Sequence, residues 1–183
     1  QLMERISPYC YWIKKEECLD LPDTIDETRA VELGTKQRKA YNEMRKHLIT
    51  EIQGESITAQ AALTKILKLR EITSGFAFDG LGEAQDIGES AKMKELENVI
   101  EDVGKRPMIV WGQFHWDIYK IAELLAKHGT TVSLFSGTND RNDSIKRFQD
   151  GSAQYLVAHV RSGGHGLTFT NCSYETFFSM DYS

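Results

Sequence analysis

The sequence predicts an α/β fold: an open, mostly parallel sheet with helices on both faces. Two observations support this prediction. From residue 90 onward, short apolar runs alternate with amphipathic patterns of helical length, and polar or glycine-rich turns follow the apolar runs. This succession is typical of an open parallel sheet, in which helices connect the strands. A chain of 183 residues with 40% hydrophobic residues is large enough for one such domain with a sizeable core.

The first half of the chain gives a less regular pattern. Residues 24–33 alternate between apolar and polar types and predict a strand. Thr35 is a predicted cap for a helix over 36–53, and apolar residues at helical spacing predict a second helix over 58–73. Residues 79–89 combine three glycines with several acids and predict a mobile loop.

The second half predicts strands and helices in regular alternation, separated by glycines and helix caps. In order, we expect a helix between Ser90 and Gly104, a strand over 108–111, a helix over 114–128, a strand over 132–135, a helix capped near Asn139 that carries Ile145 and Phe148, a strand over 155–160, and a strand over 176–180.

Ligands bind open parallel sheets at the carboxyl ends of the strands. The segments expected there are Gly112-Gln113, Ser136-Gly137-Thr138, residues 160–166 and Asp181. All of the candidate functional segments therefore fall on one rim of the predicted sheet.

The glycine-rich segment at 162–166 is the richest of these. Three glycines in four positions let the backbone approach phosphate or ribose oxygens and expose several N–H donors. A tight strand-to-helix turn without a ligand fits the same pattern. The segment is not a P-loop, because no Lys-Ser or Lys-Thr follows the glycines, and no G-x-G-x-x-G opens a helix as in a dinucleotide fold.

The other polar positions are also open to two interpretations. Gln113 either faces a ligand or caps the next helix, and the turn at 136–138 either holds an oxyanion or only caps a helix. His159 and His165 have no acidic or thiol partner at ligand spacing, so we expect no metal site and no acid–base catalysis. Trp111 and Trp116 are expected to pack in the core and on a helix face. The basic residues of 36–46 and 140–147 are interleaved with other polar residues and predict solvated surface.

Charge and cysteine content limit the function classes. A formal net charge of −5 argues against a domain that wraps DNA with positive charge, but it allows a motor that touches a few phosphates. Three unclustered cysteines fit neither a zinc site nor a simple disulfide framework, and are expected to be reduced in a cytoplasmic protein. We expect no membrane association, because the sequence has no apolar stretch long enough to span a bilayer.

The order of the segments resembles a known family. MIVWGQF, LFSGT, LVAHVRSGGHGLTFT and FFSMD are similar, in that order, to the second RecA-like motor lobe of superfamily-two helicases of Swi/Snf type, with a P-loop NTPase-type architecture. Upstream, ISPYCYWIKKEECLDLPD, KQRKAYNEM, LKLREITSGF and ESAKMKELENVI resemble the family's preceding segments, with Lys92 at the family's lysine. The segment SGGHGL is similar to the corresponding segment of small bacterial or bacteriophage members of the family.

The resemblance implies a division of labour between two lobes. Residues 1–35 would be the segment that leads in from the first RecA-like lobe, and 36–183 the second lobe. The first lobe would bind ATP and Mg²⁺ through motifs expected before Gln1, and an arginine motif would follow Ser183, so the chain is expected to be incomplete at both ends and inactive alone. The residues of the loop that couples nucleotide to DNA would be Gly163, Gly164 and Gly166. The residues that face the DNA backbone would be Gln113, Ser136, Gly137, Thr138 and Arg161.

Two positions depart from the family pattern. His159-Val160 stands where the family has Ser-Thr, and Thr168 stands where it has Asn. The first change removes a hydroxyl expected to touch phosphate. Two other hypotheses for the function remain. The chain could be a non-catalytic DNA- or protein-binding module that keeps the shape of the lobe, or an unrelated α/β nucleotide-binding enzyme.

Overall fold

A computed structural model gives the structure of the chain. It describes residues 5–11, 13, 23–54, 58–79, 81–88, 90–134, 140–163 and 166–180. The chain divides into two compact units, Gln1–Ala30 and Val31–Ser183. The boundary expected at residue 35 stays a prediction.

The strand predicted over 24–33 is wrong, because these residues are irregular. A strand requires a neighbouring strand for its backbone hydrogen bonds, and this segment pairs with none of the described strands. Ile25, which the alternating pattern would have buried, is 90% exposed. Within the first unit, the described residues contain one short 3₁₀ helix, η1 (Ser7–Tyr9).

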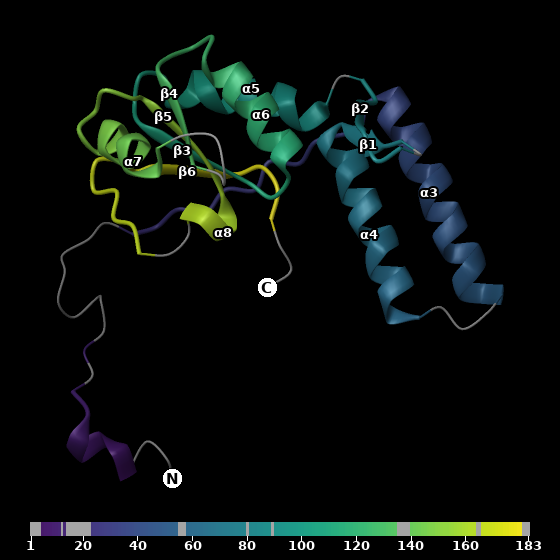
Figure 1. The fold of residues 1–183 in the computed structure, drawn as a ribbon, viewed down its shortest axis with the longest axis horizontal. Coiled ribbons are helices and arrows are strands. Elements are labelled where there is room, and N and C mark those ends of the chain that lie inside the picture. The colour runs from purple at the N-terminus through teal and green to yellow at the C-terminus, as the bar shows by residue number, and fades with distance from the viewer. Residues whose placement is uncertain are drawn as a thin grey trace. The chain divides into compact units, whose positions relative to one another are not determined.

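Two helices predicted in the first half are confirmed: α3 (Thr35–Gly54) and α4 (Ala59–Ser74), which pack against each other (Figure 1). The Thr58 hydroxyl caps α4 by accepting a hydrogen bond from the Ala61 N–H. Gly75 ends α4 in the left-handed conformation that glycine adopts most easily.

The loop predicted over 79–89 contains part of a small β-hairpin instead. β1 (Phe76–Phe78) and β2 (Ala84–Asp86) pair in antiparallel fashion. Asp79 shapes the turn between them, because its Oδ1 accepts hydrogen bonds from the N–H groups of Leu81 and Glu83. Strands of three residues are too short to give a periodic signal, which explains why the hairpin was not predicted.

The rest of the chain forms the predicted alternation of helices and strands. Its elements are α5 (Ala91–Val103), β3 (Met108–Gly112), α6 (His115–Leu125), β4 (Thr131–Leu134), α7 (Arg141–Gln149), β5 (Tyr155–His159), α8 (Val160–Gly163) and β6 (Tyr174–Phe177). The four strands β3 to β6 make one parallel sheet in the order β4-β5-β3-β6. The predicted fold class is therefore confirmed.

Both faces of this sheet are covered. Helices α5 and α6 lie on one face and α7 lies on the other (Figure 1). Met108 and Val110 of β3 pack on the first face, whereas Ile109 and Trp111 pack on the second with Phe148 of α7. Burial of both faces explains why the central strands β3 and β5 are nearly continuous runs of apolar residues, whereas the edge strand β6 alternates between half-buried and exposed residues.

Several predicted boundaries shift for local reasons. Phe114 precedes α6 as its cap residue, and Val160 begins α8 instead of ending β5. Asp140 caps α7 by accepting from the Asn142 N–H, although the sequence suggested only a surface role for it. Ser90 stands at the N-cap of α5 as predicted, but its hydroxyl makes no capping hydrogen bond.

Candidate functional site

The parallel register aligns the carboxyl ends of three strands. Gly112 of β3 lies beside His159 of β5, and Trp111 lies beside Phe177 of β6. We call the residues just beyond these ends, 113, 159–163 and 178–180, the rim.

The rim contains only some of the residues singled out in the sequence. Gln113, Arg161 and Gly163 lie on it, and Gly166 follows it. The remaining candidates lie outside the described residues: Ser136, Gly137, Thr138, Gly164, His165 and Asp181.

Gln113 has a hydrogen-bonded backbone N–H and a buried side-chain oxygen. Its N–H donates a hydrogen bond to the Ser179 hydroxyl at 2.8 Å. Its side-chain Oε1 is buried and accepts no hydrogen bond from the described part of the chain. A buried amide oxygen without a partner is uncommon in folded proteins, and it is suited to receive a donor from a ligand or a solvent molecule.

Behind Gln113 lies a buried carboxylate, Asp117, which is only 1% exposed. Its Oδ2 accepts hydrogen bonds from the hydroxyls of Ser179, at 2.5 Å, and Ser74, at 3.3 Å. Its Oδ1 has no well-aligned partner among the described residues. This cluster was not predicted from the sequence, although Asp117 stands at helical spacing with the buried residues Ile121 and Leu124.

Burial raises the pKa of Asp117 from 3.8 to about 6, because a charged carboxylate is poorly solvated there. Hydrogen bonds from Ser179 and Ser74 and the positive charge of Lys92 oppose this rise. Burial likewise lowers the pKa of the Lys92 ammonium, whose Nζ donates to the Phe178 carbonyl at 3.3 Å. Lys92, noted from the sequence as the family's lysine, thus holds the backbone that leaves β6.

At the end of β5, His159 and Arg161 are joined locally. The Arg161 N–H donates to His159 Nδ1 at 3.1 Å, so a neutral His159 carries its proton on Nε2. The His159 ring meets the His115 ring edge-on, with centroids 6.1 Å apart. The rim therefore holds one imidazole, which packs against that of His115, and the exposed side chain of Arg161.

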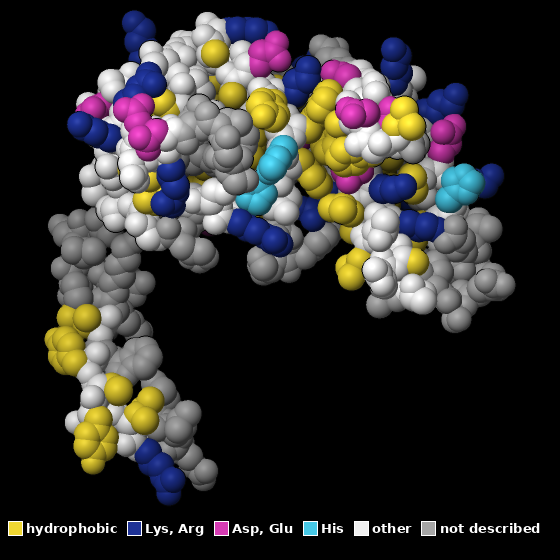
Figure 2. All heavy atoms as spheres, in the orientation of Figure 1, with side chains coloured by type: hydrophobic (Ala, Val, Ile, Leu, Met, Phe, Trp, Pro, Cys, Tyr) yellow, Lys and Arg dark blue, Asp and Glu magenta, His cyan; other side chains and the backbone are white. Residues whose placement is uncertain are grey.

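Arg141, which is exposed as predicted, also contacts the segment that follows β5. Its Nη2 donates to the Ser162 carbonyl at 3.0 Å and so links the start of α7 to the glycine-rich segment. The other charges are dispersed: basic and acidic side chains alternate over the visible face, with no single basic patch (Figure 2).

Gly163 and Gly166 have different reasons to be glycine. A Cβ atom on Gly163 would lie 2.8 Å from Cζ3 of Trp111 and 3.1 Å from Cβ of Ala158. Gly166 instead has a φ of +72°, which favours glycine. Gly163 is thus required for packing under the sheet, and its role in a nucleotide–DNA coupling loop stays a prediction.

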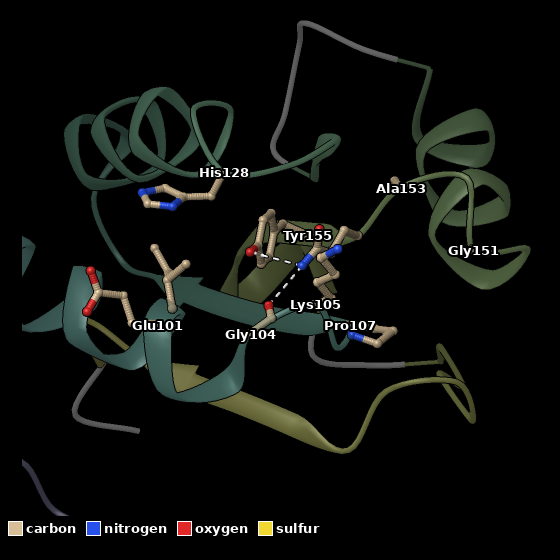
Figure 3. Close-up of a pocket in the computed structure, with 10 residues that line it drawn as sticks. Glu101, Gly104, Lys105, Pro107, His128, Gly151, Ala153 and Tyr155 are labelled. Carbon is tan, nitrogen blue, oxygen red and sulfur yellow. Dashed lines mark hydrogen bonds between the residues drawn. The ribbon is translucent and has the colours of Figure 1, made fainter.

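A pocket of about 560 Å³ opens at the opposite end of the sheet (Figure 3). Pro107 and Gln154, which line it, precede β3 and β5, so the pocket lies at the amino ends of the strands. The Gln154 amide donates to the Gly104 carbonyl and to the Tyr155 hydroxyl across it (Figure 3). Of the predicted site residues that the structure describes, none lines the pocket, and open α/β sheets bind ligands at the other end.

The described residues contain no evident metal site. Among them, no three His, Cys, Asp or Glu side chains lie close enough to hold a metal ion. Cys10 and Cys172 are free thiols. No helix in the described part of the chain is both long and apolar enough to cross a membrane.

Solved structures share this architecture. The Sulfolobus solfataricus SWI2/SNF2 ATPase C-terminal domain matches with a TM-score of 0.65 at 22% sequence identity, over 81% of this chain and 68% of that one. The chain has the fold of a SWI2/SNF2 ATPase C-terminal lobe. The C-terminal part of the Fun30 ATPase domain matches this lobe with the same TM-score at 12% identity, over 84% of this chain and 74% of that one. The architecture implied by the sequence resemblance is therefore confirmed.

Two proteins are related to the lobe in sequence. Protein p41 of Acyrthosiphon pisum secondary endosymbiont phage 1 is 28% identical over 148 residues, which cover 81% of this chain and 31% of p41. An uncharacterized ATP-dependent helicase of Mycoplasma pneumoniae is 29% identical over 188 residues, which cover 98% of this chain and 18% of the helicase. The lobe thus spans less than a third of either relative. No family profile matches the chain.

Proposed function

We propose that this chain is the second motor lobe of an ATP-dependent DNA helicase or translocase of Swi/Snf type. In this role it helps to close the ATP cleft and grips the DNA backbone with its rim. The observation that carries the proposal is the combination of the SWI2/SNF2 lobe fold with an exposed arginine, Arg161, on the rim. The Mycoplasma relative supports the use of ATP, since it is described as an ATP-dependent helicase.

The rim has the chemistry that DNA phosphates require. Phosphate oxygens are bound by arginine, by side-chain amides and by backbone N–H groups, and such contacts position a protein without reading sequence. Arg161 and Gln113 supply the first two, and the backbone around Gly166 is open to a ligand because no atom lies within 4 Å of a Cβ built there. A grip through a few contacts is compatible with the net charge of −5.

ATP and Mg²⁺ would be held mainly by the first RecA-like lobe of the same polypeptide. Phosphoryl transfer requires a phosphate-binding lysine, Mg²⁺ and an arginine finger. The 183-residue sequence has no G-x-x-x-x-G-K-[ST] motif.

The proposal is tested first by DNA binding of the Arg161→Ala variant. We expect the chain to bind a fluorescently labelled duplex weakly and with strong salt dependence, because binding depends on phosphate contacts. Loss of Arg161 should weaken binding and reduce the slope of log K against log salt by about one. Arg45→Ala, on the exposed part of α3, is the matched control and should leave the slope unchanged. Equal behaviour of the two variants in fluorescence anisotropy would argue against a DNA grip at the rim.

The second test concerns hydrolysis. We expect the purified chain to show no DNA-stimulated release of phosphate from ATP. Addition of the first lobe from the parent polypeptide should be needed before any DNA-dependent rate is measured. A robust rate from the pure chain would overturn the division of labour proposed above.

A further inference from the structure

We propose that Asp117 is the positioning residue of the rim: its carboxylate orients the Ser179 hydroxyl, which in turn fixes the backbone of Gln113. The same carboxylate oxygen binds Ser74 and so ties the end of α4 to the rim. The inference rests on the proposed function only where it assigns Gln113 to DNA; the hydrogen-bonded chain itself is independent of that assignment.

The direction of the hydrogen bonds follows from the donor inventory. A serine hydroxyl has one proton, and Ser179 donates it to Asp117 Oδ2 at 2.5 Å. Its lone pairs are then left for the Gln113 N–H, which donates to Oγ at 2.8 Å. An ionised carboxylate can only accept, so it enforces this direction, whereas a protonated carboxyl or an amide can also donate and let the hydroxyl turn.

The cluster connects segments that are far apart in the sequence. Ser74 is the last residue of α4, Asp117 lies in the first turn of α6, and Ser179 follows β6. Ser74 and Ser179 are separated from Asp117 by 43 and 62 positions, respectively. One buried carboxylate therefore links the helical pair, the helix after β3 and the chain that leaves β6.

A role in stability alone does not explain an acid at this position. Replacing a buried charge by a neutral group is often neutral or stabilising, because the charge must be taken out of water. Burial raises the pKa of Asp117 to about 6, which means that the fold disfavours its charged form. Of the charged groups on the neighbouring helices, Lys92 of α5 acts directly on Asp117, Arg70 of α4 acts on Lys92, and the buried Glu71 of α4 interacts with Lys68.

The experiment measures amide hydrogen exchange of Gln113 by NMR in the 183-residue chain and its variants. Ser179→Ala should speed exchange at Gln113 by about tenfold, because the acceptor is lost. Asp117→Asn should speed it by about tenfold at pH 7.5, where the natural carboxyl is charged and the bond is charge-assisted, and by less than about twofold at pH 5. The Ala126 N–H, bonded to the Ala122 carbonyl in the same helix, is the internal control and should not change.

Further variants keep the proposal falsifiable if Asp117→Asn does not fold. Ser179→Thr retains the hydroxyl and should restore the protection that Ser179→Ala loses. Ser74→Ala should leave Gln113 protected but loosen the amides at the end of α4. Unchanged protection at Gln113 in Ser179→Ala, or the same loss at pH 5 and pH 7.5 in Asp117→Asn, would overturn the positioning role.

DNA binding by the same variants separates the two proposals. If exchange at Gln113 changes as expected and the affinity for a labelled duplex falls with it, both are supported. If exchange changes and the affinity does not, the positioning role is supported and the assignment of Gln113 to DNA is overturned.

Discussion

The parallel sheet and the helical pair of the second unit bury their apolar residues to very different extents. In the sheet, Leu156 and Val157 are completely buried, and all of β3 is inaccessible to solvent or nearly so. In the helical pair, Leu63 of α4 is 62% exposed, and Leu81 in the hairpin turn is 90% exposed. This difference in burial indicates that the sheet contributes most of the stability of the fold, whereas the helical pair depends on its contacts with the sheet layer.

The difference in burial arises from the number of layers of secondary structure that cover each region. Strands β3 and β5 have helices on both faces, so alternate residues enter two separate cores. The helices α3 and α4 pack mainly against each other and one small hairpin, with a smaller contact between α4 and α5, and these contacts cannot cover every apolar side chain.

Aromatic and polar contacts attach the helical pair to the helices that cover the sheet. The Phe76 ring, fully buried after α4, meets the rings of Phe114 and Trp116 at centroid distances of 5.4 and 5.6 Å. The Gln37 side chain, also buried, donates to the Ile72 carbonyl and accepts from the Ala91 N–H, so it joins α3, α4 and α5. With Ser74 and Asp117, these contacts form the joint between the two regions.

The largest change in the free energy of unfolding is expected when the same substitution, leucine to alanine, is made in the sheet rather than in the helical pair. Leu156→Ala should lower the free energy of unfolding by about 3 kcal/mol, because it removes buried methyl groups and leaves a cavity. Leu63→Ala should change it by less than about 0.5 kcal/mol, since the side chain is already in water. Urea denaturation measures both. Equal losses would show that the helical pair has a core of its own.

Asp117 should give a pH dependence of similar size at the joint. Its pKa is about 6 in the folded protein against an ordinary 3.8, so the folded state binds the proton more tightly. The resulting stability is fully present below pH 3.8 and is lost as the pH rises through 6, by about 3 kcal/mol in total. Asp117→Asn does not titrate, so the unfolding free energies of the natural chain and the variant should diverge between pH 4 and 7.5. Parallel pH profiles would contradict this prediction.

Gly163→Ala tests the packing under the sheet. The added Cβ would meet Trp111, and overpacking of this kind should cost about 2 kcal/mol. Shortening the ring with Trp111→Phe should make the same glycine substitution less costly, which a double-mutant cycle of unfolding free energies measures. Additive effects would show that Trp111 is not the obstacle.

The smallest effect is expected at the start of α4. Thr58→Ala removes the hydroxyl that caps the helix and should cost about 1 kcal/mol. Thr64→Ala in the same helix is the control, because that hydroxyl bonds only to the Gln60 carbonyl one turn earlier. If thermal denaturation shows equal losses, the cap does not stabilise α4.

The fold was largely predictable because its signals are local. Continuous apolar runs identified β3 and β5, helical spacing alone identified α4, and helical spacing between the cap Ser90 and Gly104 identified α5. The hairpin was missed because its strands are three residues long, and residues 24–33 were misassigned because alternation does not reveal whether a partner strand exists.

The candidate site was predictable only in part. Gln113 and Arg161 were placed on the rim because they follow apolar runs that become neighbouring strands. The partners that fix Gln113, Ser179 and Asp117, could not be found in the same way. Their hydrogen bonds cross many positions of the chain, and periodicity carries no information about such pairs.

Two features could thus be derived from the sequence alone: the presence of a parallel sheet, and the identity of the segments that leave its carboxyl ends. Both follow from the periodicity of neighbouring side chains. Only the tertiary structure decided the strand order β4-β5-β3-β6, the fit of Gly163 beneath Trp111, and the burial of Asp117 between Ser74 and Ser179. These features depend on which distant segments share a dry interior, where a carboxylate is poorly solvated and a single added carbon has no room.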